Sequence, residues 1–572
     1  MRSLNTLVAA RSRSTRLLGK PAFVGLSVAL LFWWQSLTPT LIPRSWVVQA
    51  VVSGACLAVG YGVGALLGRW LQRLMGVWGR TPSVRWRRWW TVLAAAWLIG
   101  VLFGATLWLR WQNDQRTLMG LNVIGWFDAV PMVVLSALAG ALLVLIGRAL
   151  GNGVRALNRF NERHLPAVLG APSSVVLILV LVIVLGGGVF FRGATALADS
   201  VYGSTNDETT EGTAAPTASS VSGSRGSLVP WETLGRMGRD FVATATTADE
   251  LVRFHGADAK LAQPVRVYVG VRSADSLAER AELAVRELER AGGFDREVLV
   301  VWVPTGTGWV IPEAAAALEQ LHRGNTAIVA LQYSFLPSVL SVFMDPGLAI
   351  KAGSALFNAV RAHWSQLPPD HRPKLLVFGK SLGTSGVEAP FAAVDASSSV
   401  GNLVARTDGA LVVGGKYSNP ILAQLTRERD AGSPVWQPII DRGRVVRFVT
   451  RDPNRPALNP EWPQPRIVYL QHPSDPVSYW GVEALWRPPD WLDRPRGYDV
   501  PEAASWFPIV SGVQAAADLI HQLSPPPGFG HVYSTDYVNG WAQVLPPDGW
   551  ADADTQRLEQ FLFDGHVHES EP

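Results

Sequence analysis

The sequence predicts a bundle of about five transmembrane helices over residues 1–200, followed by an α/β domain over residues 229–572 with a doubly wound, mostly parallel sheet. Three observations support this fold class. Long apolar stretches with few charges occupy the first third of the chain. Beyond residue 229, short apolar runs alternate with helical patterns, which is typical of a parallel sheet covered on both faces. One of those runs leads into a serine flanked by glycines.

Five apolar stretches approach the roughly 20 residues that a helix needs to cross a bilayer. They cover residues 23–41, 47–67, 90–109, 131–146 and 175–191, and the fourth is the shortest. A cleaved signal peptide is the alternative for the first stretch, because a basic region precedes it. The sequence favours a membrane helix there, since no small-residue cleavage site follows the apolar run and further spans come after it.

The basic residues predict the orientation, because Lys and Arg accumulate in loops that stay cytoplasmic. They precede the first stretch and fill the loops after the second and the fourth. We therefore expect a multi-pass membrane protein with a cytoplasmic N-terminus and everything after Arg192 outside. Residues 1–172 hold 18 Lys or Arg against 3 Asp or Glu, and the remainder holds 32 against 43. The net charge of +4 thus reflects topology and gives no reason to expect nucleic-acid binding.

Anchoring is the expected role of the helices. No Asp, Glu, Lys or His lies in the middle of an apolar stretch, whereas transporters normally carry such groups along a pathway. Gly60, Gly64 and Gly68 recur at a spacing of four on the second stretch, which lets another backbone approach closely. Packing inside the bundle is favoured, and a homo-oligomer seam is the alternative. The single cysteine, Cys56, lies in the same stretch, so no thiol nucleophile is expected.

Residues 201–228 are rich in Ser, Thr, Gly and Ala, and they predict a disordered linker. Beyond it, strands are expected at 265–269, 297–303, 326–331, 374–378, 409–413 and 466–470. Helices are expected between them at 276–291, 312–322, 346–366, 386–394 and 420–429. In such sheets, reactive groups gather beyond the carboxyl ends of the strands.

The pattern G-x-S-x-G at 379–383 follows the fourth expected strand. This pattern mounts a nucleophilic serine on a sharp turn between a strand and a helix, and its glycines leave room where a side chain would crowd the turn. We expect Ser381 to be the nucleophile of an α/β-hydrolase. Serine then needs a histidine base oriented by a carboxylate, in the chain order Ser, acid, His.

The expected acid is Asp475, because it lies in the loop directly after the strand at 466–470. Asp395 and Asp441 are alternatives, but neither directly follows a strand. The expected base is His531, in a glycine-flanked loop near the end of the chain. The other histidines considered fall on a helical pattern, in a polar tail or beside Asp475, and they are His521, His566, His568 and His472.

The oxyanion of an acyl-transfer intermediate needs two backbone donors, one after the serine and one after the third strand of the fold. Leu382 is expected to supply the first. The second is expected from Thr305, Gly306 or Thr307, although an ordinary glycine turn is the simpler interpretation there, and residues 333–338 are the fallback. No phosphate-binding loop pattern and no helical His pair at metal spacing are present, so no cofactor or metal is expected.

These segments together resemble the membrane-anchored α/β-hydrolases of actinobacteria, a family of largely unassigned substrate. The resemblance rests on LTPTLIPR at 37–44, LVPWETLGRMGRDFV at 228–242, RVYVG at 266–270, PTGTGWV at 304–310, LQYSFLPS at 331–338, GKSLG at 379–383, RIVYLQHPSDPV at 466–477 and PPGFGHVY at 526–533. It implies a hydrolase domain on the outer side of a bacterial plasma membrane. Two features depart from the family pattern: Lys380 replaces a usual glutamate, and residues 507–523 read as helix with no clear final strand before His531.

The combined expectation is an integral-membrane serine hydrolase that acts on a lipid or cell-envelope ester through Ser381, His531 and Asp475. An acyltransferase of the same mechanism is the first alternative. A non-catalytic envelope scaffold that keeps the hydrolase fold is the second. A transporter would need an ion pathway through the apolar stretches.

Overall fold

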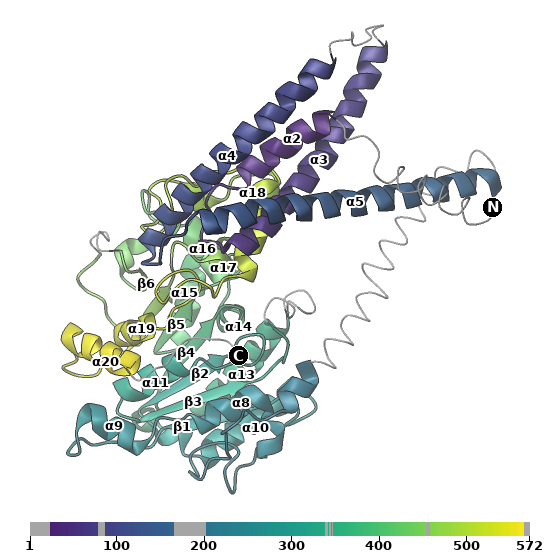
Figure 1. Cartoon of the computed structure of the whole chain (residues 1–572). Coiled ribbons are helices and arrows are strands. Elements are labelled where there is room, and N and C mark those ends of the chain that lie inside the picture. The colour runs from purple at the N-terminus through teal and green to yellow at the C-terminus, as the bar shows by residue number, and fades with distance from the viewer. Residues whose placement is uncertain are drawn as a thin grey trace. The chain divides into compact units, whose positions relative to one another are not determined.

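The structure is a computed structural model of the 572-residue chain. It describes residues 23–77, 86–164, 202–337, 341, 345, 347–452 and 458–564. The chain divides into two compact units (Figure 1). The helical unit comprises residues 1–194, 481–492 and 499–519, and the α/β unit comprises residues 195–480, 493–498 and 520–572.

The helical unit contains α2 (Phe23–Gln35), α3 (Trp46–Val77), α4 (Trp86–Leu118), α5 (Trp126–His164) and most of α18 (Val510–Ile520). Within the described residues, three helices are long and apolar enough to cross a membrane, namely α3, α4 and α5. The expected first stretch forms a helix of only 13 residues, because the prolines at 39 and 43 lack the N–H that a helix requires. The stretch at 175–191 lies outside the described residues, so the count of five spans is not confirmed.

Residues 36–44, between α2 and α3, are not helical, yet all of them are buried. Buried backbone carbonyls in an apolar setting need hydrogen-bond donors, and glutamine side chains supply them. Gln49 donates to the Ser36 carbonyl at 2.8 Å, and Gln514 donates to the Ser36 and Thr38 carbonyls at 3.0 and 2.9 Å. Gln115 donates to the carbonyl of residue 40 at 2.8 Å. The conspicuous LTPTLIPR segment is therefore a polar-lined break between two helices.

The glycines at 60, 64 and 68 all face α2 of the same chain. A Cβ built on Gly60 would lie 2.7 Å from Cβ of Phe32, and one on Gly64 would lie 2.5 Å from the carbonyl oxygen of Val24. A Cβ on Gly68 would lie 3.2 Å from Cβ of Val24. These glycines allow α3 to pack closely on α2 inside the bundle, and a homo-oligomer stays an untested alternative.

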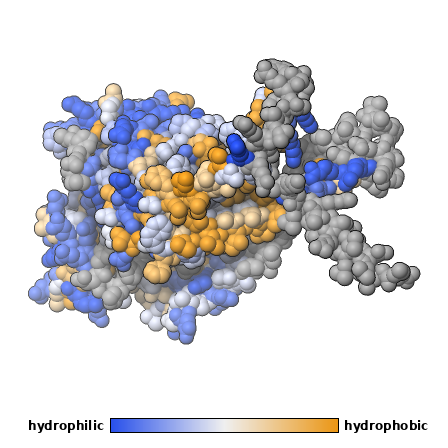
Figure 2. Space-filling view, turned by 45° about the horizontal axis from the view of Figure 1, so that its top comes forward, coloured by the Kyte–Doolittle hydropathy of each residue, from blue (hydrophilic) through white to orange (hydrophobic). Residues whose placement is uncertain are grey.

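The long helices also present many large apolar side chains outward. Soluble proteins rarely expose large contiguous areas of this kind, and Figure 2 shows apolar side chains gathered over a broad area of one face of the molecule. On α3, α4 and α5 the exposed residues include Leu66, Trp70, Leu98, Ile99, Phe127, Leu138 and Leu150.

The α/β unit is built on seven strands that are parallel throughout. Their order in the sheet is β1-β3-β2-β4-β5-β7-β6. The strands are β1 (Val265–Val269), β2 (Val298–Val303), β3 (Thr326–Leu331), β4 (Lys374–Lys380), β5 (Gly409–Val413), β6 (Val446–Val449) and β7 (Arg466–Leu470). All six expected strands are present. The sequence analysis missed β6, because a run of four residues interrupted by Arg447 is too short to give a strand pattern.

Helices cover both faces of this sheet, as Figure 1 shows. One layer contains α10 (Leu277–Arg290), α13 (Leu348–Trp364) and α14 (Gly383–Glu388), and the other contains α11 (Pro312–Leu321), α19 (Asp536–Val544) and α20 (Asp552–Asp564). The remaining helices are α8 (Gly235–Ala243), α9 (Ala248–His255), α15 (Ala396–Arg406), α16 (Pro420–Arg427) and α17 (Pro476–Tyr479). The helix expected at 386–394 begins earlier, at Gly383, directly after the serine turn.

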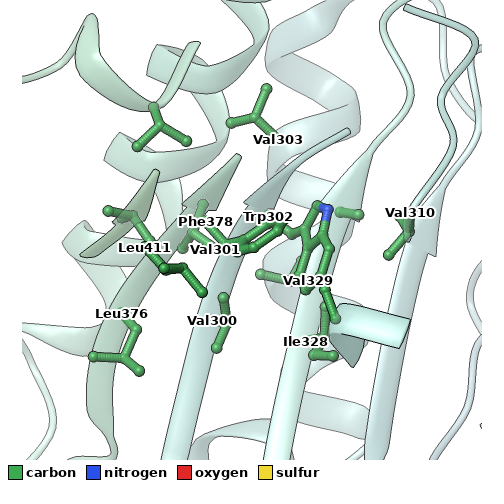
Figure 3. Packing of buried hydrophobic residues seen from close by; sticks show 14 of the residues in the cluster. Val300, Val301, Trp302, Val303, Val310, Ile328, Val329, Leu376, Phe378 and Leu411 are labelled. Carbon is green, nitrogen blue, oxygen red and sulfur yellow. The ribbon is translucent and has the colours of Figure 1, made fainter. Parts of the chain in front are cut away.

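Large aromatic side chains fill the core between the sheet and α19. The rings of Trp302 and Phe378, on neighbouring strands, lie with their centroids 3.8 Å apart, and Trp541 stacks on Phe378 at 5.4 Å. Figure 3 shows Trp302 and Phe378 beside Val300 and Leu411, which extend the same layer across the strands. This rigid centre fixes the ends of β2, β4 and β5.

The expected linker at 201–228 is ordered over residues 202–228. Val221 forms a bridge with Arg266 of β1, and the Ser222 N–H donates to the Arg266 carbonyl at 2.9 Å. Ser222 and Ser227 also donate from their hydroxyls to the buried Glu287 carboxylate at 3.1 and 2.6 Å. Composition indicated disorder because these side chains are small and polar. In the structure, this segment instead donates hydrogen bonds to the buried Glu287 carboxylate and pairs with the edge strand β1.

Candidate active site

Ser381 lies on a sharp turn between β4 and α14. Its φ of 55° is a left-handed conformation that residues other than glycine rarely adopt. The Ser381 N–H donates to the Val413 carbonyl at 3.0 Å, which ties the turn to the end of β5. A Cβ on Gly379 would lie 2.7 Å from Val387, and one on Gly383 would collide with the Val303 carbonyl. The two glycines of the motif are thus required by close packing.

Asp475 follows β7 and caps the N-terminus of α17. It is fully buried, and its carboxylate accepts three hydrogen bonds. The Val477 N–H donates to Oδ1 at 2.8 Å, while His531 Nδ1 and the Tyr533 hydroxyl both donate to Oδ2 at 2.7 Å. Burial raises the pKa of Asp475, but His531 and these hydrogen bonds more than offset it and hold the pKa below its ordinary value.

The end of β5 contacts the Ser381 turn on one residue and the His531–Asp475 pair on the next. Val413 accepts the hydrogen bond from the Ser381 backbone. The next residue, Gly414, touches the acid and base: a Cβ there would lie 2.6 Å from His531 Cε1 and 3.0 Å from Asp475 Oδ2. The Ser381 turn and the His531–Asp475 pair therefore adjoin consecutive residues at the carboxyl edge of the sheet, where parallel folds gather reactive groups.

His531 is held by a loop and not by a final strand. The Gly530 N–H donates to the Ser474 hydroxyl at 2.9 Å, and the His531 N–H donates to the Gln522 carbonyl at 3.3 Å. A single bridge between Phe529 and Val532 is the extent of strand-like pairing within this loop. The structure thus has no final strand directly before His531, as the sequence indicated. Hydrogen bonds such as the one between Gly530 and Ser474, in the loop that carries Asp475, hold this segment instead.

The expected oxyanion donors are arranged less simply. The Thr305 N–H donates to the Trp309 carbonyl at 3.2 Å, so this donor is used inside its own loop. Gly383 packs on the carbonyls of residues 303 and 304, which brings the serine turn close to the start of that loop. Thr305 is therefore removed from the expected donors, while Leu382, Gly306 and Thr307 stay predictions. In the fallback segment, the Tyr333 hydroxyl donates to the Pro304 carbonyl at 3.0 Å and supports the loop.

Lys380 points into the protein and not to solvent. Its side chain is 2% exposed. Nζ lies 5.8 Å from the ring centroid of Trp309 and 5.9 Å from that of Tyr533. These distances are within the range of cation–π contacts, so the Lys380 amine lies close to both rings, on the residue directly before Ser381.

The alternative acids have other places. Asp395 is partly exposed and caps α15 by accepting from the Ser398 N–H at 2.7 Å. Asp441 is exposed on a short 3-10 turn. His566 and His568 lie outside the described residues. In the described part of the chain, no three His, Cys, Asp or Glu side chains form a group that could hold a metal ion.

Sequence reasoning missed one buried carboxyl group near the serine helix. Glu388, at the end of α14, accepts from the N–H groups of Ile421 and Leu422 at 2.8 and 3.2 Å and from the Tyr469 hydroxyl at 3.2 Å. Burial raises its pKa to about 7. No sequence signal marks this residue, since it looks like any glutamate at the end of a short helix.

Comparisons with known proteins agree with this geometry. The profile described as "Alpha/beta-hydrolase family" matches residues 265–558, and the profile described as "Alpha/beta-hydrolase family N-terminus" matches residues 37–245. The chain belongs to this family. The two matches cover both the N-terminal helices and the sheet with its candidate site, so the family membership applies to both parts of the chain.

A comparison with curated proteins finds no match. Among solved structures, the chain is similar to a Trichoderma reesei cutinase in complex with a C11Y4 phosphonate inhibitor, at 12% identity and a TM-score of 0.22. That alignment covers 48% of this chain and 90% of the cutinase. A similarity at this level is too weak to carry an argument about fold or activity.

Proposed function

We propose that this protein is a membrane-anchored serine hydrolase in which Ser381 is the nucleophile, His531 the general base and acid, and Asp475 the orienting carboxylate. The observation that carries the proposal is the buried 2.7 Å hydrogen bond between His531 and Asp475, at the strand end to which the Ser381 turn is tied. Membership of the α/β-hydrolase family supports the same reading.

The geometry suggests how the reaction runs. Because His531 Nδ1 donates to Asp475, Nε2 is the nitrogen that takes the proton of the Ser381 hydroxyl. The serine oxygen then attacks the carbonyl carbon of an ester, and the Leu382 N–H with Gly306 or Thr307 stabilises the oxyanion. His531 returns the proton to the leaving alcohol, which leaves an acyl-enzyme. Water, activated by the same histidine, releases the acid and restores Ser381.

The substrate class is proposed from location. Helices α3, α4 and α5 are long and apolar enough to anchor the chain in a membrane, and the basic loops favour a cytoplasmic N-terminus with the α/β unit on the outer side. An enzyme placed there would meet lipid and cell-envelope esters. Transfer of the acyl group to another alcohol follows the same chemistry and differs only in the acceptor.

A fluorophosphonate probe tests the catalytic part of the proposal, because it reacts with a serine only when a base activates it. The full-length protein in detergent should label rapidly, and Ser381→Ala should lose labelling. Ser385→Ala is the matched control, because Ser385 lies in the same short helix and donates to Asn419 at 2.6 Å, away from the base. It should label like the wild type.

The scaffold alternative makes the opposite prediction for the same measurement. If the wild-type protein labels no faster than Ser381→Ala, the hydrolase fold is kept for binding and the enzyme proposal is wrong. If Ser381→Ala still labels at the wild-type rate, the nucleophile is another serine.

A further inference from the structure

Several hydrogen bonds join two short segments to each other, His472 to Asp475 and Gly530 to Tyr533. One end of this contact is the pair already described, in which His531 and Tyr533 donate to Asp475. At the other end, Gly530 is held from both sides. Its N–H donates to the Ser474 hydroxyl at 2.9 Å, and its carbonyl lies 2.8 Å from His472 Nδ1. The peptide immediately before the candidate base is thus fixed by residues immediately before the acid.

Both ring nitrogens of His472 face hydrogen-bond acceptors. Nδ1 faces the Gly530 carbonyl at 2.8 Å, and Nε2 faces Oδ2 of Asp536 at 3.0 Å. Burial raises the pKa of Asp536, but His472 and Arg451 more than offset it and hold the pKa below its ordinary value. Arg451 donates to the other oxygen of Asp536 at 2.7 Å.

The position of the His472 ring is fixed further by Tyr533. The two rings stack with centroids 4.0 Å apart and an interplanar angle of 11°. The His472 backbone N–H also donates to the Tyr533 hydroxyl at 3.2 Å, and that hydroxyl donates onward to Asp475. His472 is 2% exposed. His472 therefore connects the Asp536 carboxylate on α19 to the loop that carries His531. These contacts hold the His472 side chain in one rotamer.

We propose that His472 is a positioning residue for His531, and that its Nδ1 contact with the Gly530 carbonyl sets the distance between the imidazole of His531 and Ser381. This inference rests on the proposed function, because it assumes that His531 is the base. Its physical basis is the missing final strand: a base on a loop needs outside contacts to hold its geometry, and a displacement of about 1 Å can cost on the order of 100-fold in rate.

Two amide substitutions separate the two contacts of His472. The side-chain nitrogen of Asn occupies the place of Nδ1, so His472→Asn can still donate to Gly530. The side-chain nitrogen of Gln reaches the place of Nε2, so His472→Gln can still donate to Asp536 but not to Gly530. We expect His472→Gln to lower the maximal rate of fluorophosphonate inactivation about 10- to 100-fold. His472→Asn should keep a rate within a few-fold of the wild type.

The probe's apparent dissociation constant should be unchanged in both variants, because His472 does not contact the substrate in this proposal. A general loss of folding would instead lower the labelled fraction and leave the rate of the remaining active molecules unchanged. His322→Asn is the matched control, since His322 is also buried but lies at the end of α11. It should change thermal stability and leave the inactivation rate as in the wild type.

The possible results are distinguishable from failure of the proposed function. If the wild type does not label above Ser381→Ala, the hydrolase proposal fails and this inference with it. If labelling depends on Ser381 but His472→Gln reacts at the wild-type rate, only the positioning role is wrong. Equal losses in His472→Asn and His472→Gln would also overturn it, because the Gly530 contact would then not be the one that matters.

Discussion

At the scale of single residues, Lys380 shows that a position left open by the G-x-S-x-G pattern can still be enclosed by the fold. Its neighbours in the pattern are fixed by the turn, but its own side chain is enclosed by Trp309 and Tyr533. A glutamate at this position would place a negative charge against two ring faces, which repel it. Lysine at this position therefore suits the two ring faces better than a carboxylate would.

Glu388 is a second residue whose environment decides its chemistry. An unfolded glutamate has a pKa of 4.5, whereas burial raises that of Glu388 to about 7. Between these two pH values, the folded chain binds a proton that the unfolded chain has lost. The free energy of unfolding therefore falls as the pH rises from about 4.5 to about 7, by about 3 kcal/mol from this group, and is then constant.

Glu388→Gln should remove this pH dependence, because the amide oxygen still accepts from Ile421 and Leu422 but carries no titrating proton. We expect the melting temperature of the wild type to fall relative to that of Glu388→Gln between pH 5 and pH 7.5. Thermal unfolding of the full-length protein in detergent at the two pH values measures this. Glu428→Gln, which removes an exposed carboxylate, is the control, and the melting temperature of the wild type should not fall relative to that of this variant. An equal relative fall against both variants would contradict the assignment to Glu388.

Ser381, Asp475 and His531 could be proposed from the sequence because each follows from a local pattern: a motif, a strand end and a glycine-flanked loop. Their catalytic roles stay predictions. It could not reveal that the Thr305 N–H is used within its loop, since that depends on a bond to the Trp309 carbonyl. The partners of His472 and Glu388 were also hidden. Such contacts join segments far apart in the chain, and no local pattern encodes them.

At the scale of elements, the break between α2 and α3 is stabilised by an ion pair in an apolar environment. Arg44 Nη2 and Asp518 Oδ1 lie 2.9 Å apart, with side chains 2% and 1% exposed. Arg44 also contacts Gln49 and Thr40. A buried pair of this kind need not add much to stability as a whole, but loss of one partner leaves an uncompensated charge.

Arg44→Met and Asp518→Leu should therefore each destabilise the protein by about 3–5 kcal/mol. The double variant should be more stable than either single variant, because it leaves no unpaired charge. Thermal unfolding in detergent compares the three. Arg272→Met, which breaks the exposed pair of Arg272 with Asp207, is the control and should cost at most about 1 kcal/mol. A double variant less stable than both single variants would show that the pair itself is strongly stabilising.

Strands were the elements that the sequence predicted best. Six of the seven are near-continuous apolar runs, as expected for strands buried on both faces. The missed helix α15 begins at Ala396 in a run of three serines, where composition favours a loop and only the Asp395 cap indicates a helix. The prediction of a disordered linker at 201–228 was wrong for a related reason. Polar residues that donate hydrogen bonds to a buried carboxylate look the same in sequence as polar residues in solvent.

At the scale of the whole molecule, the three long apolar helices are compatible with membrane anchoring, and the orientation stays a prediction from charge. Cysteine accessibility tests it, because the single native cysteine, Cys56, is buried in α3. In a Cys56→Ala background, Asp370→Cys places a thiol on the exposed surface of the α/β unit. An impermeant maleimide should label it in intact spheroplasts.

Thr81→Cys is the matched position for the opposite side, because Thr81 lies in the arginine-rich loop between the second and third apolar stretches. It should label only after the membrane is opened. Labelling of Thr81→Cys in intact spheroplasts, with Asp370→Cys protected, would reverse the proposed orientation and place the site in the cytoplasm.

The division of the chain into two units limits which fragments of this protein can fold on their own. Residues 499–519 belong to the helical unit, although they lie in sequence between Asp475 and His531. A chain cut near residue 200 would keep α18 but lose the helices that cover Phe507, Ile509 and Val513, and it would leave Asp518 without Arg44. Such a fragment would carry an apolar helix without its packing partners. We therefore expect the chain after residue 200 to be destabilised when it is expressed alone, because the sequence of the α/β unit is interrupted by a segment that packs on the N-terminal helices.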